Sequence, residues 1–405
     1  MSIGTNKTAL ILGLGHPRQN LFLRSFYQAN LSVHAAYTEL TTFRWSRYLD
    51  NFVHLPANPD QQLETLIDFG KAHGGFLVPT NDEFIGLVSK NRDLLDRYFN
   101  IPLPSWDIVG PMMDREQSNA VASKLGIKVP KTWAADDIEE LDQIIAQLDF
   151  QNADYILKTR SVLSEPADLA GIRQTKPAPT NSKDFLSACQ EIQRRTGSYP
   201  LIQQVIPGGA DAAIGVTMVV NPAGEVISAY CVRRLRLKTY KLGSGYVHPY
   251  VLGSVVWCET IHDEEAMEAA RQLVKTFNYS GQITIEFRRD SRDNSMYLMK
   301  IEPRPVRATS LSASLGMDVA KSLYGAFHGE ALQIKHDYED GLGWLYIQPY
   351  LSSLIKNEHG NRMDLLKLLR KVGKLRAFGE EFMDPLPLAT GIIKLGTRGI
   401  LSKFR

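Results

Sequence analysis

The sequence predicts an α/β segment followed by an α+β segment, on three observations. Residues 1–112 alternate short apolar runs with helical patterns, which indicates a parallel sheet with crossover helices. From about residue 130, short strands come in pairs joined by turns, which indicates antiparallel pairing. The chain has 405 residues, more than one hydrophobic core usually serves, and this length favours two or three domains.

The expected elements follow from these patterns along the chain. In the first segment they are strands at residues 9–12, 32–36 and 75–79, with helices at 19–29 and from about 82 to 98. A helix is expected from Asp114, as its N-cap, to Leu125, and we place a domain boundary near Pro111. The second segment is expected to hold a helix at 263–277 and strands at 155–158, 201–205, 215–220, 226–230, 282–287 and 296–301.

Residues 331–405, the last part of the chain, are expected to form a C-terminal extension. Residues 361–405 contain ten Lys or Arg and four Asp or Glu, and residues 364–378 have the leucine spacing of a basic amphipathic helix. Such a helix either covers the protein's own surface or contacts an anionic membrane surface. The first alternative is favoured, because most proteins bury a leucine stripe of this kind.

Composition excludes several classes of protein. The net charge of +2 gives no global sign of nucleic-acid binding. The three cysteines, Cys189, Cys231 and Cys258, include no CxxC pair, so neither a zinc site nor a disulfide framework is indicated. No apolar run reaches the length of a transmembrane helix, and the first residues lack the features of a signal peptide. We therefore expect a cytoplasmic protein without a transmembrane segment.

The turn after the first expected strand contains Gly13 and Gly15. A dinucleotide-binding fingerprint needs a third glycine where this chain has Arg18, and an acidic residue at the end of the second strand, which here ends in Ala36 and Tyr37. A tight strand-to-helix turn is therefore favoured over a nicotinamide site.

Two cations lie where a phosphate could be bound. Arg115 follows the expected N-cap Asp114, and Lys158 ends the apolar strand at 155–158. A lysine at a strand end projects into a cleft, and its point charge suits phosphate oxygens. Taken alone, Lys158 is more often a solvent-exposed strand-end lysine.

A second feature is the strand end at residues 203–208, which we call the hinge. The sequence QQVIPG ends a strand at a Pro-Gly turn and so exposes backbone N–H and C=O groups, the pair that an adenine edge requires. Asp211 follows shortly and has the chemistry to hold ribose hydroxyls. The alternative is a plain strand and turn.

A third feature combines Glu286 on one strand with Lys300, Glu302, Arg304 and Arg307 at the end of its partner. Residues 300, 302 and 304 share one face by the two-residue period of a strand. Magnesium prefers one or two carboxylates together with phosphate oxygens, so this set favours a magnesium–phosphate site over a structural ion pair.

In this order the features resemble the ATP-grasp superfamily, in particular carbamoyl-phosphate synthase large chains and D-aspartate-ligase-like carboxylate–amine ligases. The resemblance implies a pre-ATP-grasp domain at 1–112 and a two-lobed ATP-grasp domain at 113–330. The small lobe would span about 113–210 and the large lobe about 211–330. The extension at 331–405 would follow.

The resemblance also implies a role for each residue. Arg115 and Lys158 would contact phosphates, Gln204 and Ile206 would meet adenine through their backbone beside Gln203, and Asp211 would hold the ribose. The remaining roles would be magnesium binding by Glu286 and Glu302, phosphate or acyl-phosphate contact by Arg304, and substrate contact by Arg307, Arg234 and Arg236.

One departure from the family pattern concerns Lys300. The family usually has Glu-x-Asn-Pro-Arg, whereas this chain has Lys300, Glu302, Pro303 and Arg304 at the same positions. The expected function is an ATP- and Mg²⁺-dependent ligase that joins a small carboxylate to an amine. The alternative is a nucleotide-binding protein with a degenerate metal site. The sequence does not determine the oligomeric state and is compatible with a homo-oligomer.

Overall fold

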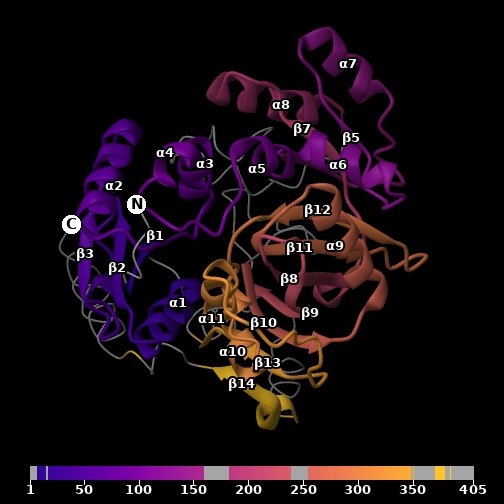
Figure 1. Cartoon of the computed structure of the whole chain (residues 1–405). Helices are drawn as coiled ribbons and strands as arrows, with labels where there is room; N and C mark the ends of the chain where they lie inside the picture. Colours follow the sequence, from indigo (N-terminus) through magenta and orange to yellow (C-terminus); the bar gives the residue numbers. More distant parts are fainter. Residues whose placement is uncertain are drawn as a thin grey trace, which may run out of the picture.

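The computed structural model describes residues 7–14, 17–158, 182–238, 254–347, 350, 370–378 and 384. These residues form three β-sheets with helices around them (Figure 1). The order of elements confirms the predicted fold class, a parallel-sheet segment followed by a segment of antiparallel strands.

The N-terminal sheet is fully parallel, with strand order β3-β2-β1-β4. Its strands are β1 (Thr8–Leu12), β2 (Ser32–Tyr37), β3 (Asn51–His54) and β4 (Phe76–Pro79). Its helices are α1 (Pro17–Gln28), α2 (Pro59–His73), α3 (Asp82–Lys90) and α4 (Arg92–Leu95), and η1 (Thr42–Trp45) is a 3₁₀ turn. The predicted helix over 82–98 is therefore two helices, because Asn91 ends α3. The elements β3 and α2 were not predicted.

Two further helices, α5 (Trp106–Met113) and α6 (Arg115–Lys124), lead into the second sheet. The Asp114 side chain accepts a hydrogen bond from the Gln117 N–H at 2.9 Å, so this residue is the N-cap of α6, as predicted. The small sheet has the order β5-β7-β6. It consists of β5 (Thr132–Trp133), β6 (Tyr155–Lys158) and β7 (Leu201–Gln204), with α7 (Ile138–Ala146) and α8 (Ser182–Thr196) packed on it.

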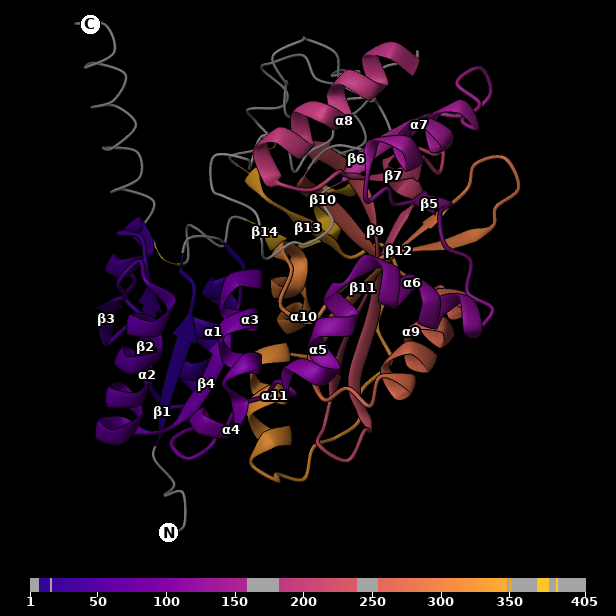
Figure 2. The same cartoon turned by 90° about the horizontal axis from the view of Figure 1, so that it is seen from above.

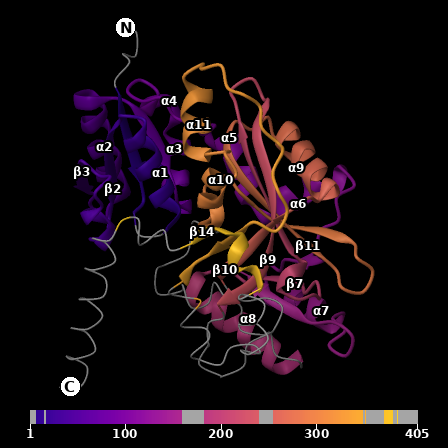
Figure 3. The same cartoon turned by 90° about the horizontal axis from the view of Figure 1, so that it is seen from below.

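The large sheet has the order β12-β11-β8-β9-β10-β13-β14. Its strands are β8 (Ala213–Val220), β9 (Val226–Lys238), β10 (Ser254–Ile261), β11 (Gly281–Arg289), β12 (Met296–Glu302), β13 (Gly343–Leu345) and β14 (Leu375–Phe378). The helices near it are α9 (Glu264–Thr276), α10 (Leu311–Ser314) and α11 (Val319–Phe327), with 3₁₀ turns η3 (Ala210–Ala212), η4 (Arg307–Ser310) and η5 (Val372–Lys374). Figures 2 and 3 show α10 and α11 between the N-terminal sheet and the large sheet.

Hydrophobic packing joins the N-terminal sheet to the large sheet. One cluster of buried side chains contains Leu10 of β1 and Phe84 of the adjoining helix α3, together with Val216 and Ile285 of the large sheet. The small sheet has a separate core, which includes Leu157, Phe185 and Ile202. The small sheet is thus a packing unit of its own, connected to a larger body.

The C-terminal extension departs from its prediction. Of the helix expected at 364–378, residues 364–369 lie outside the described part of the chain. Residues 375–378 form strand β14, which pairs parallel with β13, so the helical prediction is wrong there. The edge of the large sheet offers unpaired backbone groups to this segment, and the resulting tertiary pairing outweighs its helical periodicity. None of the described helices is long and apolar enough to cross a membrane.

Candidate functional site

Lys158 ends β6 at the edge where the small sheet faces the large one. Its Nζ donates to Oε1 of Gln203 at 2.5 Å, and Nε2 of Gln203 donates to Oγ1 of Thr132 at 3.1 Å. Gln203 is 2% exposed, so this contact holds the lysine on a buried amide. The alternative of a solvent-exposed strand-end lysine therefore does not describe this side chain, and its contact with phosphates stays a prediction.

Three charged groups from other elements act on Lys158. Burial lowers the pKa of its ammonium group well below the usual value, the cations Arg115 and Lys300 lower it further, and the carboxylate of Glu286 opposes them. Residues 115, 158, 286 and 300 belong to four separate elements of the chain. The structure therefore brings Lys158 and Arg115 together with the charged pair on β11 and β12.

Glu286 and Lys300 are direct cross-strand partners in the β11–β12 pair. The Glu286 carboxylate forms an ion pair with Nη2 of Arg234 on β9. Arg236, two residues further on, is 4% exposed, and its guanidinium lies 5.5 Å from the centre of the Tyr350 ring. Arg234 thus lies at the charged site, while Arg236 is buried against an aromatic ring.

Glu302 lies between two cations. Its Oε1 is 2.6 Å from Nζ of Lys300, and its Oε2 is 2.6 Å from Nη1 of Arg304. Burial raises the pKa of the Glu302 carboxyl, but Arg304 and Lys300 outweigh burial and hold that pKa below its usual value. Glu302 is therefore a buried, ionised carboxylate.

Arg304 connects this site to the N-terminal segment. Its Nε lies 2.5 Å from Oδ1 of Asp82 and its Nη2 lies 3.1 Å from Oδ2, which is a bidentate pair. Burial lowers the pKa of this guanidinium, and the neighbouring carboxylates of Glu302 and Asp82 raise it above its usual value overall. Arg304 is 9% exposed, so its predicted contact with a phosphate requires the ligand to enter a nearly closed network.

Asp82 was missed by the sequence analysis. It is the first residue of α3, directly after strand β4, and the carboxyl ends of parallel strands are a usual position for site residues. That placement was the available signal, but a sequence does not show which distant arginine the carboxylate contacts.

The hinge lies between the small and large sheets. The Gln204 and Val205 N–H groups donate to the carbonyls of Lys131 and Asp154 at 2.9 and 2.8 Å. Ile206 is 3% exposed, and its carbonyl accepts from Nε of Arg288 at 2.7 Å. Asp211 lies in η3 and is exposed. The contact of the hinge backbone with adenine stays a prediction, and Arg288 is a second residue that the sequence analysis missed.

Arg307 begins η4 and is half-buried. Within the described chain it forms no ion pair, unlike Arg304 and Lys300. Its charge thus remains available to a ligand.

Metal-binding groups are few in the described residues. No cluster of three or more His, Cys, Asp or Glu side chains that could hold a metal ion occurs among them. The cysteines are free and buried, and burial raises the pKa of each thiol to about 12. The oxygen donors on the site face are the carboxylates of Glu286 and Glu302, both in ion pairs.

No family model matches the chain. The C-terminal section of the carbamoyl phosphate synthase large chain of Methanopyrus kandleri is 24% identical over 220 residues, which are 53% of this chain and 37% of that protein. The chain thus spans little more than a third of this curated relative.

Solved structures match more of the chain. N5-carboxyaminoimidazole synthetase from Staphylococcus aureus, in complex with ADP, has a TM-score of 0.62 and 17% identity, with 88% of each chain covered. A biotin carboxylase–β,γ-ATP complex from Campylobacter jejuni has a TM-score of 0.59 and 16% identity, covering 80% of this chain and 71% of that one. Together with the order of strands and charged residues above, these likenesses show that the chain has the ATP-grasp fold.

Proposed function

We propose that this protein is an ATP-dependent carboxylate–amine ligase. The observation that carries the proposal is the convergence of Lys158 and Arg115 with Glu286 and Lys300, four charged groups from separate elements. Charged groups are costly to bury together unless a ligand or a partner uses them. The support from similar structures is that they were solved in complex with ADP and with β,γ-ATP.

ATP would lie between the two sheets. Lys158 and Arg115 would contact its phosphates, the backbone of Gln204 and Ile206 would meet adenine, and Asp211 would hold the ribose. The small lobe would then be residues 113–210 and the large lobe 211–330, with the hinge between them. The separate core of the small sheet supports this division.

Magnesium would be held by Glu286 and Glu302 together with phosphate oxygens. Both residues lie on one face of adjoining strands, and oxygen donors of this kind suit Mg²⁺. When bound, the ion would supply positive charge to the phosphates. Arg304 stays on Asp82 and Glu302, so its proposed task is to keep Glu302 ionised and in place.

The proposed reaction has two steps. A substrate carboxylate oxygen attacks the γ-phosphorus, the bond to the β-phosphate oxygen breaks, and an acyl phosphate and ADP result. An amine then attacks the acyl carbon and phosphate leaves, which forms the amide after loss of a proton. Arg307, which forms no ion pair within the described residues, and Arg234 at the charged site would hold substrate carboxylates, and catalysis would consist of positioning and charge neutralisation. We place this reaction in the cytoplasm, which suits the free thiols.

A second candidate is a nucleotide-binding protein without ligase activity. The observation that favours it is the ion pair between Lys300 and Glu302, which neutralises one of the two carboxylates proposed to hold magnesium. This candidate predicts ATP binding without turnover.

ADP release measured with a panel of small carboxylates and amines tests the proposal. Turnover that requires one acid, one amine and Mg²⁺ together would support a ligase. ATP binding without turnover by any pair would favour the second candidate, and absence of ATP binding would contradict both.

A further inference from the structure

Arg288 is buried against the turn that follows β7. Its Nε donates to the Ile206 carbonyl at 2.7 Å, and its Nη2 donates to the carbonyls of Gly208 and Gly209, the second at 3.3 Å. The residue is 7% exposed. Because a guanidinium is planar and its donors are fixed in direction, three carbonyl bonds determine the path of this turn.

This turn connects the two lobes. The small sheet has its own core and ends at β7, and the large sheet begins with β8 after η3. The Ser291 N–H donates to the Pro207 carbonyl at 3.0 Å, so a second group near the end of β11 also holds the turn. Gly208 has φ +149°, and a Cβ there would lie 2.6 Å from the Cβ of Ala212. The turn is therefore tightly specified and anchored to the large lobe.

Arg288 and Glu286 lie two residues apart on β11 and therefore on one face of it. Glu286 is at the charged end of the proposed ATP site, and Arg288 reaches the hinge. The Ile206 carbonyl is bound to Arg288, and the hinge groups that we assign to the base are the Gln204 carbonyl and the Ile206 N–H. Adenine offers a donor at N6 and an acceptor at N1, which match this pair, whereas guanine offers an acceptor at O6 and a donor at N1.

We propose that Arg288 is a positioning residue for adenine, which fixes the hinge so that it accepts adenine and rejects guanine. The inference rests on the proposed ATP-binding function. A hinge freed from Arg288 can rotate its peptide groups, and a rotated peptide offers a donor where it offered an acceptor. Loss of Arg288 therefore weakens discrimination between bases as well as affinity, since discrimination depends on polar groups that a wrong base leaves unpaired.

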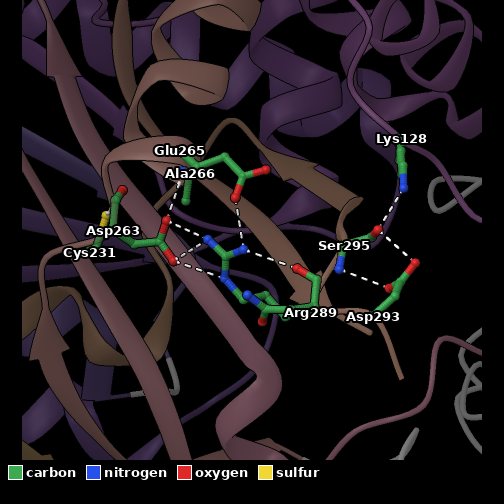
Figure 4. Close-up of polar contacts among 9 residues, drawn as sticks. Lys128, Cys231, Asp263, Glu265, Ala266, Arg289, Asp293 and Ser295 are labelled. Atoms are coloured by element: carbon green, nitrogen blue, oxygen red, sulfur yellow. Dashed lines mark hydrogen bonds and ion pairs between the residues drawn. The ribbon is translucent and has the colours of Figure 1, made fainter. Parts of the chain in front are cut away.

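The test uses calorimetry with Mg·ATP, Mg·GTP and Mg·tripolyphosphate on the full chain and three variants. Arg288→Gln removes the guanidinium, and Arg288→Lys keeps the charge with fewer donors. The matched control is Arg289→Gln. Arg289 is the next residue of β11 and faces the other way, where it binds Asp263 and Glu265 at 2.8 Å (Figure 4).

We expect Arg288→Gln to lower ATP affinity about tenfold or more and to reduce the ratio of ATP to GTP affinity by a similar factor. Tripolyphosphate affinity should change less than about threefold, because the phosphate end is untouched. Arg288→Lys should show the same changes in smaller degree. Arg289→Gln should leave the ratio unchanged, although it too loses ion pairs.

The outcomes separate the two proposals. If the unmodified protein binds none of the three ligands, the proposed function fails and this inference fails with it. If it binds ATP and both Arg288 variants keep its ratio of ATP to GTP affinity, the inference is overturned and ATP binding stands. An equal change in Arg289→Gln would also overturn it. Should Arg288→Gln not fold, the ratio measured for Arg288→Lys decides.

Discussion

The ion pair between Asp82 and Arg304 joins residues 222 positions apart in the sequence. We expect Asp82→Asn to destabilise the protein. The Arg304 side chain is 10% exposed and that of Asp82 is 21% exposed, so the pair is largely removed from water. Breaking a buried pair by removing one partner costs about 3–5 kcal/mol. In Asp82→Asn, Arg304 still forms its ion pair with Glu302, and the oxygen of the new amide can still accept a hydrogen bond from Arg304. We therefore expect the free energy of unfolding to fall by about 2–3 kcal/mol.

The matched control is Glu83→Gln. Asp82 and Glu83 are both acidic residues in the first turn of α3, so both interact with the helix dipole. Glu83 is exposed, and its replacement should cost less than about 1 kcal/mol, the usual size of that interaction. The difference between the two variants therefore reports the ion pair rather than the helix terminus.

The assay is urea denaturation followed by circular dichroism, with the free-energy change taken from the shift in midpoint at a common slope. A double-mutant cycle with Arg304→Gln should give a coupling energy of about 2 kcal/mol. Equal shifts for Asp82→Asn and Glu83→Gln, or a coupling energy near zero, would refute the reasoning.

Three further predictions concern the site. Lys158→Ala should weaken ATP binding about tenfold to a hundredfold, the value of one charge-assisted hydrogen bond. The pKa of Lys158 is lowered, and bound ATP would raise it, so calorimetry at a pH above the lowered pKa should show proton uptake when ATP binds. Unchanged ATP affinity of Lys158→Ala, or no proton uptake by the unmodified protein, would contradict the assignment. The pKa of Glu302 is lowered in the folded protein, so its ionised carboxylate stabilises the fold at pH values above about 4.3, the pKa of Glu in an unfolded chain. This stabilisation is lost as the pH falls through the lowered pKa of the folded state. The difference in the free energy of unfolding between the unmodified protein and Glu302→Gln should therefore become smaller from about pH 5 to pH 3. A difference that stays constant over this range would count against the ionised carboxylate. Lys300→Glu should change the magnesium dependence of ATP turnover, whereas turnover by this variant alone would show that Lys300 inactivates the natural site.

Local patterns were sufficient for much of the fold. The apolar runs before Gly13 and at residues 76–79 predicted strands of a parallel sheet, because a strand buried on both faces has no polar alternation. Asp114 was predicted as an N-cap from its residue type and position alone. The convergence of Lys158 with residues 286 and 300 was predicted only through the order of motifs along the chain.

Tertiary structure decided the rest. Residues 364–378 have a helical leucine pattern, yet residues 375–378 form a strand because the edge of β13 supplies hydrogen-bond partners. Asp82 and Arg288 carry no local signal of their contacts, since an ion pair or a bond to a distant carbonyl depends on how the chain packs. The sequence by itself determined which residues could carry charge to the site. Only packing decided which charges neutralise one another, because Coulomb interactions and burial depend on distance in space rather than along the chain.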